Sequence, residues 1–370
     1  MTSSTPPVRV AVAGAGAFGR NHLRVYRELE TAGAGVVLAA AVDADPTRAA
    51  EVAAKYGIPV FATAEALLAA DLKLHAASVA VPTVHHHSVA TALLEGGLDL
   101  LVEKPLAASL AEADEIIALA ERHNRIVQVG HLERFNPAIV AVEPRLKRPM
   151  FFEAHRLSIF TPRALDVDVV LDLMIHDLDI VLRFANSEVR EVRAVGLPIL
   201  SPKVDIANVR VEFASGCVAN FTGSRVSTER VRKLRFFEPR QYVSVDYARQ
   251  DLLVIGMDRA LPPQLAAAIA SGQLDAAALA KLAAQFGHKD APGPDGALGP
   301  GLSFFKPEVT PGEPLKLELQ SFIESVSTRR EPRVTARQGR AALELALAIQ
   351  AEMAAHADRA NLHDFFRQGM

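Results

Sequence analysis

The stretch VRVAVAGAGAFG, residues 8–19, decides the fold of this chain. Its first half is a run of apolar and β-branched residues, typical of a strand buried in a parallel sheet. Its second half fits the pattern G-x-G-x-x-G, which ends at Gly19. The residues that follow, from Phe18 to about Ala32, carry apolar side chains at the spacing of one helix face. The stretch therefore predicts a strand–turn–helix unit that binds a dinucleotide.

Each glycine of this pattern has a chemical reason. Gly14 permits the tight turn, Gly16 lets the backbone approach a pyrophosphate, and Gly19 lets the helix pack closely on the strand. Ala17 and Phe18 stand at the start of the helix, where N–H groups and the helix dipole favour phosphate.

An acidic residue follows the second predicted strand of the unit. The apolar run of residues 36–42 ends at Asp43, 24 positions after Gly19. An acid there accepts hydrogen bonds from a ribose diol and repels a 2′-phosphate, so it favours NAD over NADP. The alternative is that Asp43 is only a turn residue, with Asp45 capping the next helix. With the whole strand–helix–strand unit considered, we predict that the chain binds NAD.

Composition excludes several classes of function. The 370 residues are enough for two domains, and a formal net charge of −3 gives no basic surplus for a nucleic-acid partner. The single cysteine, Cys217, cannot form an intramolecular disulfide, which is consistent with a reducing compartment. No apolar run reaches the roughly 20 residues that span a bilayer, and the start lacks the order of a signal peptide. We expect a cytoplasmic protein.

The order of predicted elements indicates an α/β fold with two domains. Strands alternate with helices to about residue 130, which predicts a Rossmann domain with a doubly wound parallel sheet over residues 1–130. Further strands, predicted between residues 151 and 246, indicate an α+β domain over residues 131–370 with a mostly antiparallel sheet.

The C-terminal part of the chain contains a further irregularity. Residues from about 258 to 313 include a stretch rich in Gly and Pro, and we interpret them as an insertion. Two amphipathic helices, predicted at residues 314–327 and 336–357, are expected to pack back on the Rossmann domain.

The stretch LLVEKPL, residues 100–106, ends a predicted strand with a carboxylate, a lysine and a proline. Ligands bind outside the carboxyl ends of the strands in sheets of this kind. Lys104 can therefore reach a ligand, either as a base with a lowered pKa or as a charged group. A charged Lys104 would pair with Glu103 or polarise a substrate oxygen. Pro105 fixes the chain just after the lysine.

A helix predicted over residues 169–184 carries Asp172 and His176 on one face, with Asp168 one turn earlier. Three interpretations stay open. The pair can be an acid/base couple in which the carboxylate orients the imidazole. The three residues can bind a metal, with His155 as a further ligand, or they can form a solvated face. The three adjacent histidines at 85–87 point different ways on a helix, so we interpret them as solvated or capping, with one at the cofactor.

These motifs, taken in order, resemble the Gfo/Idh/MocA family of NAD(P)-dependent oxidoreductases. The resemblance covers nearly the whole chain except residues 258–313. The matching pieces are Gly14 to Gly19, Asp43, Pro82-Thr83, Glu103-Lys104-Pro105, Arg134-Phe135-Asn136-Pro137, Asp172 to His176, and Asp179. The resemblance implies that Lys104, Asp172 and His176 form the catalytic group, and that the sheet of the second domain floors the substrate site.

Two sets of binding residues follow from this resemblance. The residues expected at NAD are Gly14, Gly16, Ala17, Phe18, Gly19, Asp43, Val81, Pro82, His86, Glu103 and Lys104. The residues expected at the substrate are Arg134, Asn136, His155, Arg163, Asp172 and His176. The cationic candidates for a diphosphate are Arg134, Arg156, Arg163 and Arg225, each of which can instead be an ordinary salt-bridged arginine.

Within the family, the chain looks most like the branch that acts on nucleotide sugars. This resemblance implies oxidation of a secondary hydroxyl, at C3 of UDP-N-acetylglucosamine, on the route to lipid A. His176 would accept the hydroxyl proton, Asp172 would hold the imidazole and Lys104 would stabilise the alkoxide, although Lys104 and His176 can exchange roles.

Three other functions remain as alternatives: a dehydrogenase of inositol or a free sugar, a non-catalytic NAD-binding sensor, and a metal-dependent hydrolase. We also expect a homo-oligomer, either a dimer or a tetramer, joined through the sheet of the second domain.

Overall fold

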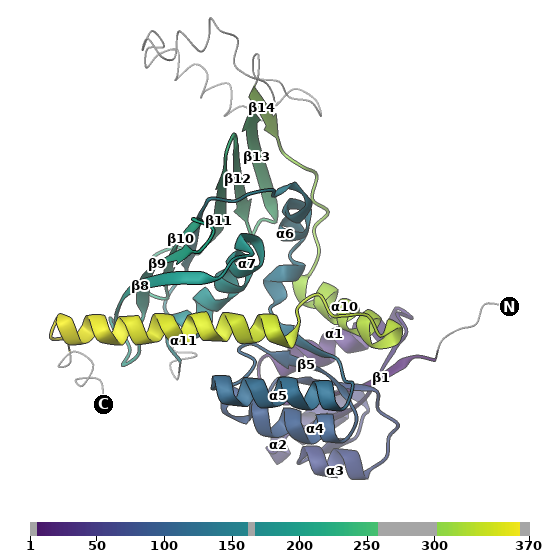
Figure 1. The fold of residues 1–370 in the computed structure, drawn as a ribbon. Helices are drawn as coiled ribbons and strands as arrows, with labels where there is room; N and C mark the ends of the chain where they lie inside the picture. Colours follow the sequence, from purple (N-terminus) through teal and green to yellow (C-terminus); the bar gives the residue numbers. More distant parts are fainter. Residues whose placement is uncertain (1–5, 162–166, 258–301, 363–370) are drawn as a thin grey trace, which may run out of the picture.

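Two β-sheets, one parallel and one mostly antiparallel, form the framework of the chain (Figure 1). This computed structural model describes residues 6–161, 167–257 and 302–362. The predicted fold class, an α/β chain with a Rossmann sheet and a second, mostly antiparallel sheet, is confirmed. Most of the expected insertion, and Arg163, lie outside the described residues.

The parallel sheet has the strand order β3-β2-β1-β4-β5-β6. Its strands are β1 (Val8–Ala13), β2 (Val36–Val42), β3 (Val60–Phe61), β4 (Ala76–Val79), β5 (Asp99–Glu103) and β6 (Val127–Gly130). The order reverses between β1 and β4, and such a reversal opens a crevice at the carboxyl ends of the strands. We retain the division into residues 1–130 and 131–370 as the proposed domain boundary.

Helices cover both faces of the parallel sheet. They are α1 (Gly19–Thr31), α2 (Pro46–Tyr56), α3 (Ala64–Ala69), α4 (His86–Glu95), which follows a 3₁₀ turn at Thr83–His85, and α5 (Leu110–Arg122). On one face, Leu23 and Tyr26 of α1 are buried against the sheet. On the other face, Leu93 of α4 and Ile116 of α5 are buried. The apolar layer that includes α1 fixes this helix on the sheet, so that its first turn lies at the crevice.

The second sheet has the order β14-β13-β12-β11-β7-β10-β9-β8, and only β7 and β10 pair in parallel. Its strands are β7 (Phe151–Leu157), β8 (Val189–Leu197), β9 (Ile206–Phe213), β10 (Val218–Ser224), β11 (Val231–Glu238), β12 (Gln241–Asp246), β13 (Asp251–Met257) and β14 (Leu302–Phe305). The sheet is thus larger than predicted, since β13 and β14 lie beyond the last strand that we expected.

The remaining helices join the two sheets. They are α6 (Pro137–Val142), flanked by 3₁₀ turns at Leu132–Phe135 and Glu143–Arg145, then α7 (Ile175–Ala185), α10 (Pro314–Thr328) and α11 (Ala336–Arg359). In Figure 1, α11 runs between α5 and the strands of the second sheet. Gly339 of α11 packs on Val129 of β6, and Met353 packs on Gly196 of β8. One helix therefore contacts both sheets.

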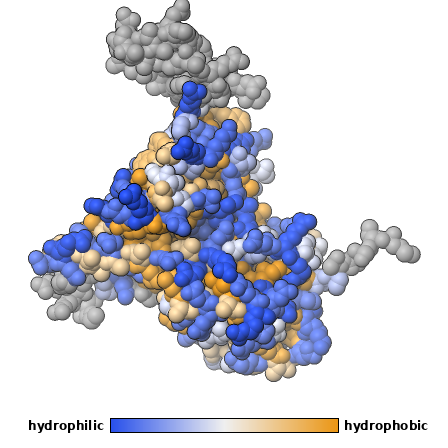
Figure 2. All heavy atoms as spheres, in the orientation of Figure 1, coloured by the Kyte–Doolittle hydropathy of each residue, from blue (hydrophilic) through white to orange (hydrophobic). Residues whose placement is uncertain are grey.

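Figure 2 shows apolar patches between hydrophilic residues on one face of the molecule. Among the exposed apolar side chains, Val195 and Leu197 of β8 and Ile206 of β9 are 36–43% exposed. Within the described residues, none of the helices is long and apolar enough to cross a membrane.

Candidate functional site

A cavity of about 600 Å³ lies where the carboxyl ends of β4 and β5 meet the start of α7 and the second sheet. Eight of the predicted site residues line it: Phe18, Val81, Pro82, His86, Glu103, Lys104, Asp172 and His176. These residues come from parts of the chain far apart in sequence, and the fold brings them to one cavity.

The glycine turn has the shape that a dinucleotide needs. Gly14 has a φ of +94°, and a Cβ there would lie 2.6 Å from the carbonyl oxygen of Ala80. A Cβ at Gly19 would lie 1.8 Å from the carbonyl oxygen of Gly14, whereas one at Gly16 would meet nothing within 4 Å. The backbone at Gly16 is therefore open to a pyrophosphate. No side chain caps the start of α1 at Phe18, so a phosphate can approach this end of the helix, although the N–H groups of Arg20 and Asn21 already donate to the carbonyl oxygens of Gly16 and Phe18.

Asp43 lies beside this turn at the end of β2. Its Oδ2 accepts a hydrogen bond from the N–H of Ala15 at 2.8 Å, and its Oδ1 accepts from the N–H of Asp45 at 2.9 Å. The guanidinium of Arg48 also pairs with the carboxylate. Burial acts to raise the pKa of Asp43, but these hydrogen bonds hold it below its ordinary value. The ionised carboxylate of Asp43 would therefore accept hydrogen bonds from a bound ribose diol while it stays paired with Arg48.

The expected nicotinamide side of the cavity is held by His86 and Glu103. The ring of His86 contacts the carbonyl oxygens of Pro105 and Val81, through Nδ1 at 2.9 Å and Nε2 at 3.0 Å. Burial lowers its pKa, so the ring is neutral and donates to only one of them. Glu103 pairs with the buried His22 at 2.9 Å. Both side chains brace the segment that carries Lys104, and the Lys104–Pro105 peptide bond is cis.

Lys104 reaches from the end of β5 to the helix that carries the other catalytic candidates. Its Nζ donates to the carbonyl oxygens of Asp172, at 2.8 Å, and Leu171, at 3.2 Å. Burial lowers the pKa of Lys104, and Arg156 acts in the same sense, while Asp172 and Glu103 oppose them. The ammonium group of Lys104 therefore lines the cavity and loses a proton more readily than an exposed lysine does.

His176 carries the most strongly perturbed imidazole of the site. Its Nδ1 is buried without a hydrogen-bond partner among the described residues. Burial lowers its pKa well below the ordinary value, and Lys104, Arg156, His131 and Arg232 add to that effect. The ring is therefore neutral near pH 7 and able to accept a proton.

The helix under these residues does not start as predicted. Its first turn, Val170–Met174, is π-helical, and the α-helix begins only at Ile175. The four-residue spacing of an α-helix therefore does not describe Asp172 relative to His176. The expectation that Asp172 orients the imidazole stays a prediction. Asp168 caps this turn, because its Oδ1 accepts from the N–H groups of Val170 and Leu171 at 2.9 and 3.1 Å.

Two arginines of the second sheet also line the cavity. Arg156 of β7 is buried and neutralised by Asp177 and Glu133, at 2.7 and 3.0 Å. Arg232 of β11 is exposed, and its guanidinium has no ion pair with any described carboxylate. The sequence reasoning did not single out Arg232. The sequence contains a pattern that could have indicated it. Each of the two arginines stands two residues from a buried or inward-facing position of its strand, so both side chains lie on the face of the sheet that carries the buried residues.

Three predicted substrate residues lie elsewhere. Arg134 is buried and donates to Asp179 at 3.4 Å and to the carbonyl oxygen of Arg333 at 3.2 Å. Asn136 caps α6, because its Oδ1 accepts from the N–H of Ala138 at 3.1 Å. Their polar groups hold the junction between the sheets and neither residue lines the cavity, so their role as substrate ligands stays a prediction.

His155 and Arg225 are also absent from the lining of the cavity. His155 is not among the cavity residues, because it alternates with Arg156 on β7 and points to the other face of the sheet. Arg225, a diphosphate candidate, is buried and bonded to Asp205 at 2.7 Å. It also donates to the carbonyl oxygen of Val167 at 2.8 Å. Alternation along a strand, which the sequence shows, could have separated His155 from Arg156.

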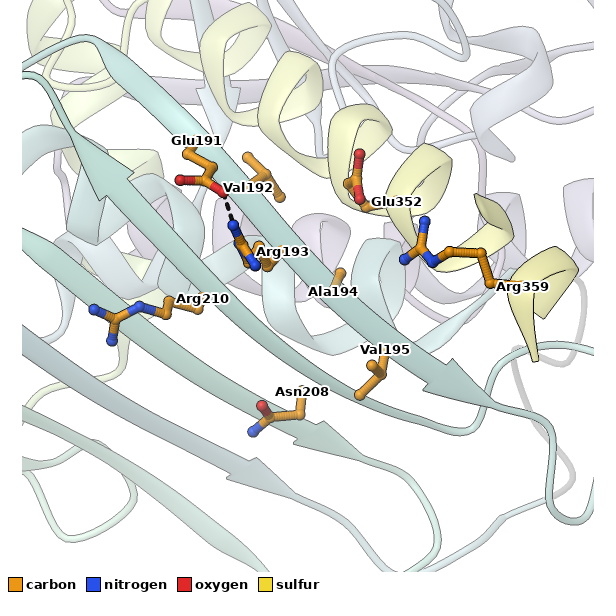
Figure 3. Close-up of a pocket in the computed structure, with 9 residues that line it drawn as sticks. All are labelled: Glu191, Val192, Arg193, Ala194, Val195, Asn208, Arg210, Glu352 and Arg359. Carbon is orange, nitrogen blue, oxygen red and sulfur yellow. Dashed lines mark hydrogen bonds and ion pairs between the residues drawn. The ribbon is translucent and has the colours of Figure 1, made fainter. Parts of the chain in front are cut away.

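A second hollow, of about 660 Å³, lies along β8 and β9 beside the end of α11 (Figure 3). It is bordered by charged side chains, and Arg193 and Arg210 pair with Glu191 and Glu212 at 2.6 and 3.3 Å. It contains none of the residues that the motifs select. We therefore place the functional site in the cavity at Lys104 and His176.

Comparisons with known proteins identify the family of the chain. The model of an oxidoreductase family with an NAD-binding Rossmann fold matches residues 8–131, and that of the GFO/IDH/MocA C-terminal domain matches residues 138–241. The chain is 37% identical to UDP-N-acetylglucosamine 3-dehydrogenase of Acidithiobacillus ferrooxidans over 246 residues, 66% of this chain and 76% of that one.

A solved structure and one further relative extend the comparison. A solved structure of the Acidithiobacillus ferrooxidans UDP-N-acetylglucosamine 3-dehydrogenase has a TM-score of 0.79 and 30% identity, and the match covers 95% of this chain and 99% of that one. The inositol 2-dehydrogenase of Acidothermus cellulolyticus is 31% identical over 195 residues, 51% of this chain and 56% of that one.

Proposed function

This chain belongs to the Gfo/Idh/MocA family of NAD-dependent oxidoreductases that act on CH–OH groups, and we propose that it oxidises C3 of UDP-N-acetylglucosamine. One observation carries the chemical part of the proposal: Lys104 and His176 line one cavity, and both have lowered pKa values. The relative at 37% identity supports the choice of sugar and of carbon.

The proposed chemistry divides the work among three residues. NAD⁺, when bound at the glycine turn and Asp43, supplies the acceptor for the hydride. His176, neutral near pH 7, accepts the hydroxyl proton. Lys104 holds the oxygen as negative charge develops on it, which can contribute on the order of 3 kcal/mol. We assign to Asp172 the positioning of Lys104 through the carbonyl contact at 2.8 Å, together with the predicted orientation of the imidazole.

The UDP group requires a cation that is not already neutralised. Arg156 is engaged by two carboxylates, whereas the exposed Arg232 has no ion pair with any carboxylate in the described part of the chain. Arginine suits a phosphate because its planar guanidinium donates two parallel hydrogen bonds. We therefore propose Arg232 as a ligand of the diphosphate, in place of Arg134 and Arg225.

The test is oxidation of a panel of sugars by the purified chain with NAD⁺, followed by the absorbance of the reduced cofactor. We expect turnover with UDP-N-acetylglucosamine and none with the free sugar. Turnover with inositol or a free hexose, and none with any UDP-sugar, would reject the proposal. That result would favour the second candidate, an inositol or free-sugar dehydrogenase, which the 31% identical inositol 2-dehydrogenase supports.

We also propose a pathway, a cellular location and an oligomeric state for the enzyme. We propose that its product enters lipid A synthesis, as the nucleotide-sugar branch implies. The single cysteine, Cys217, supports a cytoplasmic location, because the chain cannot form an internal disulfide. The exposed apolar side chains of β8 and β9 support a homo-oligomer joined through the second sheet.

A further inference from the structure

A cluster of buried polar groups lies behind the catalytic side chains. It consists of Gln128, His131, Asp179 and Glu318, each at most 2% exposed, and is called the internal cluster below. Several of its atoms have no hydrogen-bond partner among the described residues: Oε1 of Gln128, both ring nitrogens of His131, Oδ2 of Asp179 and both carboxyl oxygens of Glu318. Buried polar atoms without protein partners are usually satisfied by internal water.

The internal cluster adjoins the active site through His131. The rings of His131 and His176 are perpendicular, with centroids 6.5 Å apart, and Nδ1 of His176 also lacks a partner. Asp179 follows His176 by three residues on α7, so the two side chains share a face of the helix. The side-chain amide of Gln128 donates to the backbone carbonyl of Glu318 at 3.3 Å, which ties the far side of the cluster to α10.

The two carboxyl groups of the cluster have different surroundings. Burial raises the pKa of Glu318 well above its ordinary value, and Glu103 and Asp179 add to that effect, so Glu318 is neutral. Asp179 is paired with Arg134 at 3.4 Å through Oδ1 only. Glu318 can therefore donate a hydrogen bond to internal water, while Oδ2 of Asp179 can accept one.

We propose that the internal cluster holds ordered water and stores the proton of the substrate hydroxyl, with His131 as the positioning residue that relays it from His176 to Asp179. The proposal rests on the proposed function, because it needs a hydroxyl that His176 deprotonates. Nε2 of His176 gains the proton, and Nδ1 releases its own proton through water to His131. The second ring nitrogen of His131 gives a proton to Oδ2 of Asp179, so one proton enters the path and one is stored. After the product leaves, that proton returns along the same path to solvent.

Two substitutions and one control test this path with UDP-N-acetylglucosamine and NAD⁺. Asp179→Asn keeps the shape of the acceptor, and His131→Phe keeps a ring without nitrogens. The control is Asp99→Asn. Asp99 is as buried as Asp179 and is likewise paired with an arginine, Arg329, but it lies at the start of β5, at the end of the strand away from Lys104. In the two test variants we expect kcat to fall roughly tenfold or more and the solvent isotope effect to rise. We expect their affinity for NAD⁺ to match that of the control.

The results of these measurements either support the relay or overturn it. Unchanged kcat and isotope effect in both variants would overturn the relay. If the wild type oxidises no UDP-sugar, the proposed function fails, and nitrogen-15 NMR of histidine in the NAD⁺ complex tests the relay instead. The measurement uses the wild-type chain, in which Lys104, Arg156 and Arg232 are present beside His176. The relay requires that His176 is neutral there and carries its proton on Nδ1. A proton on Nε2 would overturn the proposal, because that nitrogen could then accept nothing from a substrate.

Discussion

At the scale of single residues, the site depends on burial beside positive charge. Removal from water favours the neutral forms of His176 and Lys104, and neighbouring cations act in the same direction. The sequence identified both residues but could not show their surroundings. His131 and Arg232 come from segments distant in the chain, and only the folded chain brings them to the imidazole.

Replacement of Lys104 by Ala tests its proposed role. We expect kcat to fall by roughly a hundredfold or more, because Lys104 is the cation that we propose at the developing alkoxide. The affinity for NAD⁺, measured by calorimetry, should change little. The control is Lys73→Ala, an exposed lysine paired with Asp71, which should leave kcat unchanged. A Lys104→Ala variant with near wild-type turnover would remove Lys104 from the mechanism.

The pH profile of kcat/KM tests the proposed base. His176 must be neutral to accept a proton, and its pKa lies well below 6.5, so activity should rise with pH through a midpoint below 6.5. Arg232→Gln removes a cation that lowers this pKa, so the midpoint should move to higher pH. A midpoint above 6.5, or one that Arg232→Gln leaves in place, would show that His176 is not the titrating base.

At the scale of elements, the sequence predicts well where local chemistry sets the geometry. The glycine pattern, the carboxylate after β2 and the alternation of β7 all lie in the structure as the residues indicate. The π-helical turn at Val170–Met174 was not predicted, because its residues equally suit an α-helix. The buried contacts of Arg134 were not predicted for a related reason: its partners Asp179 and Arg333 are far away in sequence.

Two glycines of the turn should respond differently to the same change. Gly16→Ala adds a methyl group in open space, so thermal stability should stay near that of the wild type while NAD⁺ binding weakens. Gly19→Ala drives a methyl group into the carbonyl of Gly14, which should cost on the order of 3 kcal/mol of folding free energy. Calorimetric unfolding and NAD⁺ titration measure the two effects. Equal stability of the two variants would contradict this assignment.

At the scale of the whole molecule, α10 and α11 join regions that the sequence shows only as separate patterns. Leu319 and Phe322 of α10 lie in the same apolar layer as α1, and α11 contacts both sheets. This arrangement places Glu318 behind the active site, although 214 positions separate it from Lys104. Sequence spacing cannot reveal such a placement. It does reveal the two kinds of sheet, because alternating and continuous apolar runs differ.

The oligomeric state is a property at this scale. Leu197 and Ile206 pair across β8 and β9, and both are exposed on the face of the sheet opposite α11. We expect a dimer or tetramer by light scattering, and Leu197→Asp should shift the mass towards the monomer because it places a charge in the interface. The control is Val140→Asp, since Val140 is 43% exposed in another part of the molecule. A wild type that is monomeric at all concentrations would reject this interface.

The central claim, hydride removal from C3 of a UDP-linked sugar, has a direct isotopic test. UDP-N-acetylglucosamine carrying deuterium at C3 is incubated with NAD⁺ and the purified chain, and the nicotinamide is then examined by mass spectrometry and NMR. We expect one deuterium at C4 of the reduced nicotinamide and a primary isotope effect on turnover. Reduced cofactor without deuterium would show that the hydride comes from another carbon, and would contradict oxidation at C3.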